Sequence, residues 1–361
     1  MLESTHFCRK RLSHLKDLMT ESNIEFVILL KKSVPRAQYN FFKRLVNTPF
    51  GSAVLVPLDD DPFLLCSTGT VFDVGDDACV SVRDKGVKGV EEYIIDYVNG
   101  QNFTKIGINM NVLNIKSHKI YSEEFQDIID ISKTLIPKVF FGLYPQEIEN
   151  QRVACRIADI GAEAIHSNLK PGITEIELVA EANYAMFKAG CQSLKFHTIV
   201  SSGERSARIH SFPTERKLRE GDLVLVDMGP IRDGYSADIS RTFLVGSDPS
   251  KQKMIDAVDE SVQSVIDAIK PGESCLELDA MSRRVLQRHG YPDYPHSLGH
   301  SLSGFSGPGL SKRSTTIMEV GMVHTVEPGI YLKGIGGVRI EENVVVTENG
   351  CKVLTKCPRI F

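Results

Sequence analysis

Two aspartates stand on segments that otherwise read as core strands. The stretch "VLVDMGPIRDGYSADISRTFLVG", residues 224–246, predicts two β-strands around the turn dipeptide Asp233-Gly234, and it carries Asp227 and Asp238. Because side chains alternate along a strand, either a two-residue or a four-residue loop puts both carboxylates on one face, with about 4.5–8 Å between their β-carbons. Two carboxylates this close in an apolar setting repel each other, and a divalent cation removes that repulsion.

Two metal-free arrangements also suit this pair of aspartates. A hydrogen-bonded pair that shares one proton relieves the repulsion as well. An acid dyad of the aspartic-protease kind is a further interpretation, although neither aspartate lies in an Asp-Thr/Ser-Gly string. A metal site therefore needs more ligands elsewhere in the chain.

Three later segments supply further candidate ligands. The string "PHSLGHSLSG" contributes His296 and His300 on a glycine-bearing loop, and "GMVHTVEPGIYL" contributes Glu327 inside an apolar strand. The string "GVRIEENVVVTENG" contributes Glu341, with Arg339 two residues earlier and therefore on the same face of an extended segment. The candidate set then holds four carboxylates and at least one imidazole.

Strand alternation separates these residues from their neighbours. Thr325 and Glu327 point together, so His324 points to the opposite face, and Glu342 points away from Glu341. Four carboxylates and one imidazole suit a pair of cations such as Mn²⁺, Co²⁺, Fe²⁺ or Zn²⁺. With about 3.5–4 Å between the two ions, such a pair binds a bridging hydroxide and stabilises a tetrahedral intermediate.

The candidate ligands all lie in the second of two predicted domains. Residues 1–140 alternate helix-like and strand-like segments, which predicts an α/β domain, and they carry no catalytic signature. Two prolines followed by a helical pattern from about Gln146 mark the boundary to residues 141–361. The elements that position the chemistry must therefore come from residues 141–361.

The second predicted domain contains an internal repeat. The tripeptide Lys-Pro-Gly at residues 170–172 returns at residues 270–272, an offset of 100. Each copy leads into a helix that begins with a hydroxyl residue, Thr174 or Ser274, with a glutamate three residues later, the pattern of a capping box. The repeat predicts a domain with internal pseudo-twofold symmetry, in which each half packs helices on strands.

Composition excludes several other classes of protein. The formal net charge of −4 and the pI near 6.2 give no reason to expect nucleic acid or an anionic membrane as a partner. No apolar run approaches the roughly 18–20 residues of a spanning helix, and the first residues have no apolar core of the signal-peptide type. Eight cysteines without a CxxC pair predict reduced thiols and a cytoplasmic protein.

Several strings together resemble the pita-bread metallohydrolases, a family that includes methionine aminopeptidase, prolidase, aminopeptidase P and creatinase. The resemblance covers about residues 148–354, and it rests on "DMG", "GYSADISRTF", "HSLGH", "GMVHTVEPGIY" and "GGVRIEENVVVTENG". A preceding α/β module is similar to the prolidase, aminopeptidase P and creatinase branch. The resemblance implies a creatinase-type N-terminal α/β domain over residues 1–140 and an α+β pita-bread catalytic domain over residues 141–361.

The resemblance also implies a role for each of the five candidate ligands. Asp227 would bind one metal with both oxygens, and Asp238 and Glu341 would bridge the two metals. His300 and Glu327 would complete the shell of the other metal. Creatinase keeps the fold without the metal ligands, so the presence of all five here disfavours its metal-free chemistry.

Three further residues receive roles by resemblance. Arg339 would hold a bridging carboxylate in place, His210 would assist the reacting amide beside the metals, and His296 would lie near the substrate. The family implies a peptidase that hydrolyses Xaa-Pro bonds of small peptides through a metal-bridging hydroxide. It also implies a homodimer in which the N-terminal module of one chain helps to close the site of the other.

One position departs from the family's pattern. The peptidases usually carry a second histidine in a His-Glu-x-Pro string, and this chain has Gly307 at the place of the histidine and Pro308 at that of the glutamate. Loss of one donor aimed at the transition state costs on the order of 10²–10³ in rate.

Three interpretations of this departure follow, in order of preference. The first is an Xaa-Pro peptidase in which another group, such as Ser303 or Ser306, replaces the missing histidine, or whose activity is low. The second is a metalloenzyme of the same fold that hydrolyses, or eliminates a group from, a small non-peptide substrate. The third is an inactive binding protein that has kept its metals.

Overall fold

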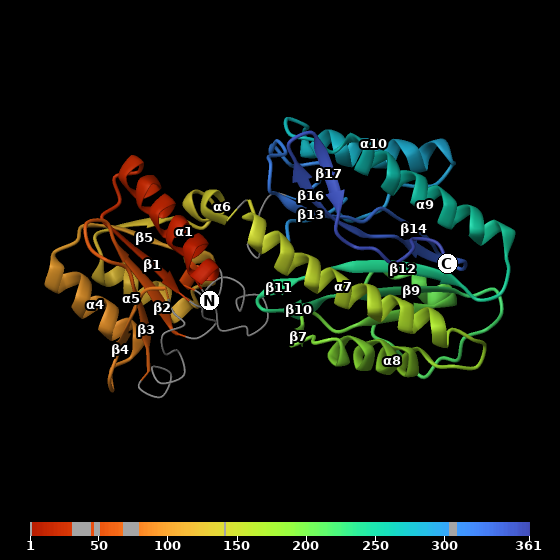
Figure 1. The fold of residues 1–361 in the computed structure, drawn as a ribbon, viewed down its shortest axis with the longest axis horizontal. Coiled ribbons are helices and arrows are strands. Elements are labelled where there is room, and N and C mark those ends of the chain that lie inside the picture. The colour runs from red at the N-terminus through yellow and green to blue at the C-terminus, as the bar shows by residue number, and fades with distance from the viewer. Residues whose placement is uncertain (1, 31–44, 47–50, 68–78, 141, 303–308) are drawn as a thin grey trace. The chain divides into compact units, whose positions relative to one another are not determined.

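The computed structural model describes residues 2–30, 45–46, 51–67, 79–140, 142–302 and 309–361. The chain divides into two compact units, Met1–Phe141 and Gly142–Phe361. Each unit has its own sheet and helices, and each is described by itself below (Figure 1).

The first unit is built on a six-stranded sheet of order β4-β3-β2-β1-β5-β6 among its described residues. The apolar strands β1, β2 and β3 are buried at every position, as expected of strands covered on both faces. The strands are β1 (Phe26–Leu30), β2 (Ala53–Pro57), β3 (Phe63–Cys66), β4 (Ser81–Asp84), β5 (Lys105–Ile108) and β6 (Asp127–Asp130). The helices are α1 (Leu2–Glu21), α4 (Val90–Gln101), α5 (Ile115–Glu124), α6 (Leu135–Phe140) and the short 3₁₀ helix η2 (Met110–Val112).

Long helices frame the second unit in two pairs among the described residues (Figure 1). The first pair is α7 (Pro145–Asn168) with α8 (Glu175–Lys188), and the second is α9 (Pro249–Ala268) with α10 (Cys275–Arg288). On α7, Ala154, Ala158 and Ala162 are fully buried at four-residue spacing. Small side chains on one face of a helix let its neighbours lie close, so α7 packs tightly in the core of this unit.

The strands of the second unit form four small sheets among the described residues. Their orders are β11-β10-β7, β12-β9-β8, β13-β16-β17 and β14-β15. The strands of the first half are β7 (Ser193–Leu194), β8 (Ile199–Ser202), β9 (Leu223–Met228), β10 (Pro230–Arg232), β11 (Tyr235–Ser236) and β12 (Ile239–Leu244), with the 3₁₀ helix η3 (Gly203–Ala207). Those of the second half are β13 (Val323–Val326), β14 (Gly329–Leu332), β15 (Gly336–Arg339), β16 (Glu342–Thr347) and β17 (Gly350–Val353).

The two halves of the second unit repeat the same local contacts at the offset of 100 residues. The amide of Gly172 donates to the carbonyl of Leu218 at 2.9 Å, and the amide of Gly272 donates to the carbonyl of Met318 at 3.0 Å. Both helices that follow begin with a hydroxyl cap, since Thr174 and Ser274 each accept a hydrogen bond from the backbone three residues on. The predicted pseudo-twofold repeat is present in the structure.

None of the eight cysteines forms a disulfide. Among the residues that the structure describes, no helix is both long enough and apolar enough to span a bilayer.

Candidate metal centre

Strand pairing brings the first two aspartates together. In the antiparallel pair of β9 and β12, Asp227 lies opposite Ser240. Asp238 precedes Ser240 by two residues, so it lies on the same face and diagonal to Asp227. The connecting hairpin pairs Arg232 with Tyr235 across a two-residue turn, one of the two loop lengths that the sequence allowed.

A glycine-bearing loop and the end of β13 supply the next two groups. The loop runs along β13, where the amide of His300 donates to Oγ1 of Thr325 at 3.0 Å and the amide of Glu327 donates to the carbonyl of Leu298 at 2.7 Å. A Cβ on Gly299 would lie 2.0 Å from the Thr325 carbonyl oxygen, so only glycine permits this close approach. The approach sets Nε2 of His300 4.0 Å from Oε1 of Glu327.

Arg339, at the end of β15, and Glu341, directly before β16, lie close to these groups. The amide of Glu341 donates to the carbonyl of Ser240 at 3.0 Å, and the Ser240 hydroxyl donates to Oε2 of Glu341 at 2.8 Å. Arg339 donates through Nε to the Ser240 hydroxyl at 2.8 Å and through Nη2 to Oδ2 of Asp227 at 2.6 Å. Arg339 therefore contacts Asp227 directly and reaches the predicted bridging carboxylate, Glu341, only through Ser240.

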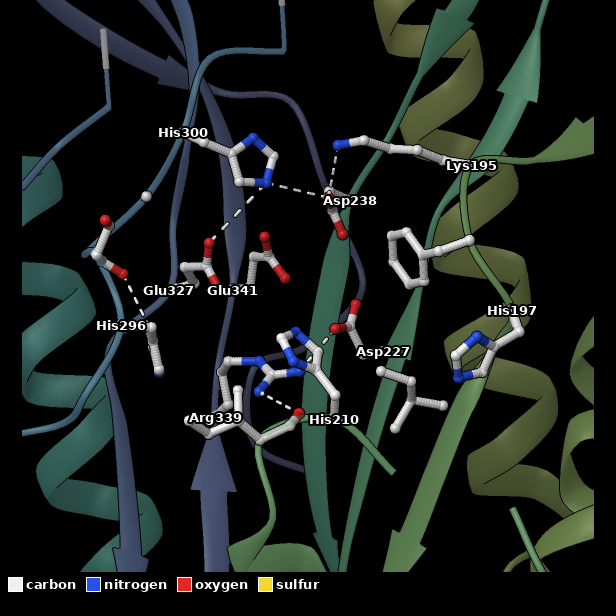
Figure 2. Close-up of a pocket in the computed structure, with 15 residues that line it drawn as sticks. Lys195, His197, His210, Asp227, Asp238, His296, His300, Glu327, Arg339 and Glu341 are labelled. Carbon is white, nitrogen blue, oxygen red and sulfur yellow. Dashed lines mark hydrogen bonds and ion pairs between the residues drawn. The ribbon is translucent and has the colours of Figure 1, made fainter. Parts of the chain in front are cut away.

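A cavity of about 500 Å³ collects these groups (Figure 2). A volume of this order suits a small ligand. Its lining includes all eight residues singled out from the sequence, which are His210, Asp227, Asp238, His296, His300, Glu327, Arg339 and Glu341. Lys195, Phe196, His197, Ile199, Ile209, Ser297 and Gly299 complete the lining.

The two histidines outside the ligand set differ in how firmly they are held. Nε2 of His296 lies 2.8 Å from the hydroxyl of Tyr331, which in turn accepts a hydrogen bond from Arg339 at 3.1 Å. Burial lowers the pKa of His296 to about 4, so its ring is neutral near pH 7. His210 is exposed at the cavity and lies beside Arg339 in Figure 2.

The donor atoms fit a divalent cation. One ligand atom each from Asp238, His300 and Glu341 lie within 4.8 Å of one another. Oδ1 of Asp227 is buried and has no hydrogen-bond partner among the described residues. Burial of a carboxylate oxygen without a hydrogen-bond partner costs free energy. A bound divalent cation would supply the missing partner, because such cations bind carboxylate oxygens.

The electrostatics of the centre point the same way. Burial raises the pKa of Asp227, Arg339 lowers it, and the nearby carboxylates Asp238 and Glu327 raise it, with a net result of about 7. Burial and the neighbouring carboxylates also raise the pKa of Glu341 well above its ordinary value. These carboxyl groups resist ionisation together unless positive charge is added, which bound cations do.

Lys195 is a site residue that the sequence interpretation missed. Its Nζ lies 2.9 Å from Oδ2 of Asp238, the same oxygen that lies 3.2 Å from Nε2 of His300. Burial alone would raise the pKa of Asp238, but Lys195 and His300 outweigh burial and lower it to about 2. No sequence signal marked Lys195, because a lysine between a strand and an aromatic residue reads as a surface residue. Ser240 and Tyr331 were also missed as partners of Arg339.

The departure at Gly307 lies outside the described residues. The same holds for Pro308 and for Ser303 and Ser306, the two serines considered as substitutes for the missing histidine. The predictions at these positions stay predictions.

Comparison with known proteins identifies the family. The profile of metallopeptidase family M24 matches residues 149–348, more than half of the chain. The chain belongs to metallopeptidase family M24. The matched region contains all eight of the site residues named above, from His210 to Glu341.

Named relatives of this M24 chain agree with that assignment. It is 40% identical over 242 residues to the Xaa-Pro dipeptidase of Pyrococcus furiosus, and this match covers 66% of this chain and 68% of that protein. It is 40% identical over 218 residues to the Xaa-Pro dipeptidase of Pyrococcus horikoshii, where the match covers 59% of this chain and 62% of that protein.

Solved structures extend the likeness to nearly the whole chain. The Xaa-Pro dipeptidase from Bacillus anthracis has a TM-score of 0.89 at 30% identity and covers 98% of this chain and all of its own. The prolidase from Pyrococcus horikoshii has a TM-score of 0.87 at 28% identity, covering 97% of this chain and 99% of its own. The predicted fold, an α/β domain followed by a pita-bread domain, and the prediction of a metallopeptidase are confirmed.

Proposed function

We propose that this M24 chain hydrolyses Xaa-Pro bonds of small peptides with two divalent cations, chosen among manganese, cobalt, zinc and iron. The observation that carries the proposal is the convergence of four carboxylates and one imidazole in a single cavity, with a buried carboxylate oxygen left without a protein partner among the described residues. Relatives that are named Xaa-Pro dipeptidase support the choice of substrate.

Five residues would hold the cations. Asp227 would bind one ion, His300 and Glu327 the other, and Asp238 and Glu341 would be shared between them. When bound, the cations would activate a water molecule for attack on the peptide carbonyl and offset the charge that develops on its oxygen. Arg339 would keep Asp227 oriented, since its guanidinium donates to Oδ2 of Asp227 at 2.6 Å.

Two histidines would act on the substrate. His210 is exposed to the cavity, where its ring would contact the peptide at the reacting amide. His296 would lie near the substrate as a fixed, neutral ring, because Tyr331 holds one of its nitrogens and the Ser297 carbonyl holds the other. His296 would therefore act through the position of its ring rather than through charge.

The proposal includes a cytoplasmic homodimer. Eight cysteines that form no disulfide suit a reducing compartment. The dimer rests on the family resemblance alone, and light scattering tests it, because a monomer would give the chain mass of 40.1 kDa at micromolar concentration. That result would contradict the dimer and leave the proposed chemistry standing.

A panel of peptides tests the proposed reaction. The purified chain is assayed with Mn²⁺ and with Co²⁺ on Xaa-Pro dipeptides and on longer Xaa-Pro-Yaa peptides. Turnover of dipeptides alone would indicate a prolidase, and turnover of longer peptides an aminopeptidase P. No turnover of either, with metals shown to be bound, would overturn the proposal and favour a non-peptide substrate. In Gly307→His, a large gain in rate would show that the missing histidine limits the reaction.

A further inference from the structure

A buried ion pair on α10 lies behind the loop that carries His296 and His300, residues 294–300, called the histidine loop below. Asp279 and Arg283 stand four residues apart, so their side chains are neighbours on one face of the helix. Nε of Arg283 donates to Oδ2 of Asp279 at 2.7 Å, and Nη2 donates to Oδ1 at 3.1 Å. Asp279 is fully buried and Arg283 is 6% exposed. A buried ion pair is weak evidence for stability, because the cost of removing both charges from water offsets their attraction.

The same two side chains bond to the backbone of the histidine loop. Nη1 of Arg283 donates to the carbonyl of Tyr294 at 2.7 Å, and Nη2 donates to the carbonyl of His296 at 2.7 Å. Oδ1 of Asp279 accepts a hydrogen bond from the amide of Leu298 at 3.0 Å. Because a guanidinium group is planar and presents its donors in fixed directions, the pair holds three alternate residues of the loop in one arrangement.

These backbone contacts lead directly to groups of the candidate metal centre. The ring of His296 lies 2.8 Å from the hydroxyl of Tyr331. The carbonyl of Leu298 accepts a hydrogen bond from the amide of Glu327 at 2.7 Å, and His300 follows Leu298 by two residues. His296 and His300 reach the cavity from the same side (Figure 2). A shift of the loop backbone would therefore move His296 and two of the proposed metal ligands together.

The internal repeat indicates that the fold itself does not require a charged pair at this place. At the offset of 100 residues, Val179 and Asn183 on α8 take the places of Asp279 and Arg283. Oδ1 of Asn183 accepts a hydrogen bond from the hydroxyl of Thr198, in the corresponding loop of the first half, at 2.6 Å. A neutral side chain thus holds that loop, whereas the charged pair occurs in the half whose loop supplies the imidazole ligand.

We propose that Asp279 and Arg283 are positioning residues of the candidate metal centre, because their ion pair fixes the backbone of the histidine loop. The fixed loop keeps Nε2 of His300 near Oε1 of Glu327, at 4.0 Å, and keeps the ring of His296 beside the cavity. Charge suits this task, since hydrogen bonds to ionised groups are about twice as strong as those between neutral groups. The inference rests on the proposed five-residue ligand set.

Two variants separate positioning from stability. Arg283→Met removes both donors to the loop carbonyls and leaves the Asp279 carboxylate buried without this arginine, so stability and metal affinity should both fall. The double variant Asp279→Asn/Arg283→Met also removes the buried charge, so part of the stability should return. The loop carbonyls still lack the guanidinium in the double variant. A role in stability alone predicts that metal affinity returns with stability, whereas positioning predicts that it stays low.

Calorimetric titration of the metal-free full-length chain with Mn²⁺ gives the affinity and the number of ions bound. We expect both variants to bind Mn²⁺ about 10–100-fold more weakly, the usual effect of losing a group that orients a metal ligand. A sample that is merely part unfolded would bind fewer ions per chain, with unchanged affinity in its folded fraction. The matched control is Arg284→Met, which removes an exposed arginine from the next position on α10 and should change neither quantity.

Hydrogen exchange of the chain in a chelator tests the hold on the loop without any metal. In Arg283→Met, amides of the histidine loop should exchange about 10–100-fold faster relative to those of β9 and β12, as expected when hydrogen bonds to a charged group are lost. The same measurement across a urea series gives the stability of the second unit in each variant.

The outcomes separate the inference from the proposed function. Metal affinity that recovers together with stability in the double variant would overturn the positioning role and leave the ligand set intact. Loop amides that exchange no faster in Arg283→Met than in the unmodified chain would do the same. No bound manganese in the unmodified chain would overturn the ligand set itself, and the inference with it.

Discussion

Replacement of Arg339 by methionine should destabilise the metal-free protein more than the same replacement of an exposed arginine. Arg339 is 1% exposed, and its guanidinium donates to Asp227 at 2.6 Å, to Ser240 at 2.8 Å and to Tyr331 at 3.1 Å. A methionine fills similar space without charge or donors. The variant leaves the buried Asp227 carboxylate without its only charged partner among the described residues.

The expected loss follows from burial. Breaking a buried ion pair by removal of one partner costs about 3–5 kcal/mol, because the remaining group is left buried either with an unpaired charge or with a proton taken up against its ordinary pKa. This loss corresponds to roughly 10²–10⁴-fold in the equilibrium constant for unfolding. The exposed pair of Arg288 and Glu260, 3.3 Å apart with side chains 68% and 48% exposed, provides the matched comparison. Arg288→Met should cost about 0–1 kcal/mol.

The assay must distinguish the two structural units. The chain has no tryptophan, so it offers no indole fluorescence to follow unfolding. Hydrogen exchange measured by mass spectrometry across a urea series reports the free energy of opening for peptides of each unit separately. The measurement is made in the presence of a chelator, so that loss of metal does not add to the loss of the ion pair. Peptides from residues 142–361 should show the change.

Two outcomes would refute the reasoning. A loss below about 1 kcal/mol in Arg339→Met would mean that Asp227 does not depend on a buried ion pair. Equal losses in peptides of both units would mean that the effect is not local to the centre. As a further check, Asp227→Asn added to Arg339→Met should restore part of the stability, because it removes the orphaned charge.

Three further predictions concern single positions. Asp238→Asn should lose bound metal and activity together by elemental analysis and peptide assay, whereas Asp233→Asn, in the exposed turn of the same hairpin, should keep both. Because burial lowers the pKa of His296 to about 4 from 6.5, the folded protein binds fewer protons than the unfolded chain in this window, so stability should fall as the pH falls from about 6.5 to 4; NMR titration of the His296 ring checks the pKa. Thr174→Ala should cost about 1 kcal/mol in urea unfolding, because the Thr174 hydroxyl caps α8, and no change would contradict this role of the cap.

Strand periodicity was sufficient to predict that two of the carboxylates, Asp227 and Asp238, share one face. The alternation rule placed Asp227 and Asp238 on one face before any register was known, and the register of β9 and β12 shows the diagonal arrangement. The same rule predicted that Glu342 points away from the centre. In the structure Glu342 pairs with the buried Arg241 at 2.9 Å, outside the cavity. The alternation of side chains along a strand is a local property, so it can be recognised in the sequence.

The residues that hydrogen-bond to the candidate ligands could not be predicted in the same way. Arg339 was expected to hold a bridging carboxylate, but its direct contact is Asp227, more than a hundred residues earlier in the chain. Lys195 lies 43 residues before Asp238, and nothing in its neighbourhood distinguishes it from a surface lysine. Such contacts depend on how separate strands cross, which no local pattern encodes.

The repeat explains how carboxylates from distant parts of the chain come to share one cavity. Asp227 on β9 and Glu327 after β13 stand at the offset of 100 residues, so each half of the domain brings one carboxylate to the shared cavity. The groups around them break the symmetry, since Asp227 is bonded to Arg339 and has Lys195 anchored beside its strand, whereas Glu327 lies near His300. The symmetry of the backbone therefore does not extend to the side chains that hold these carboxylates.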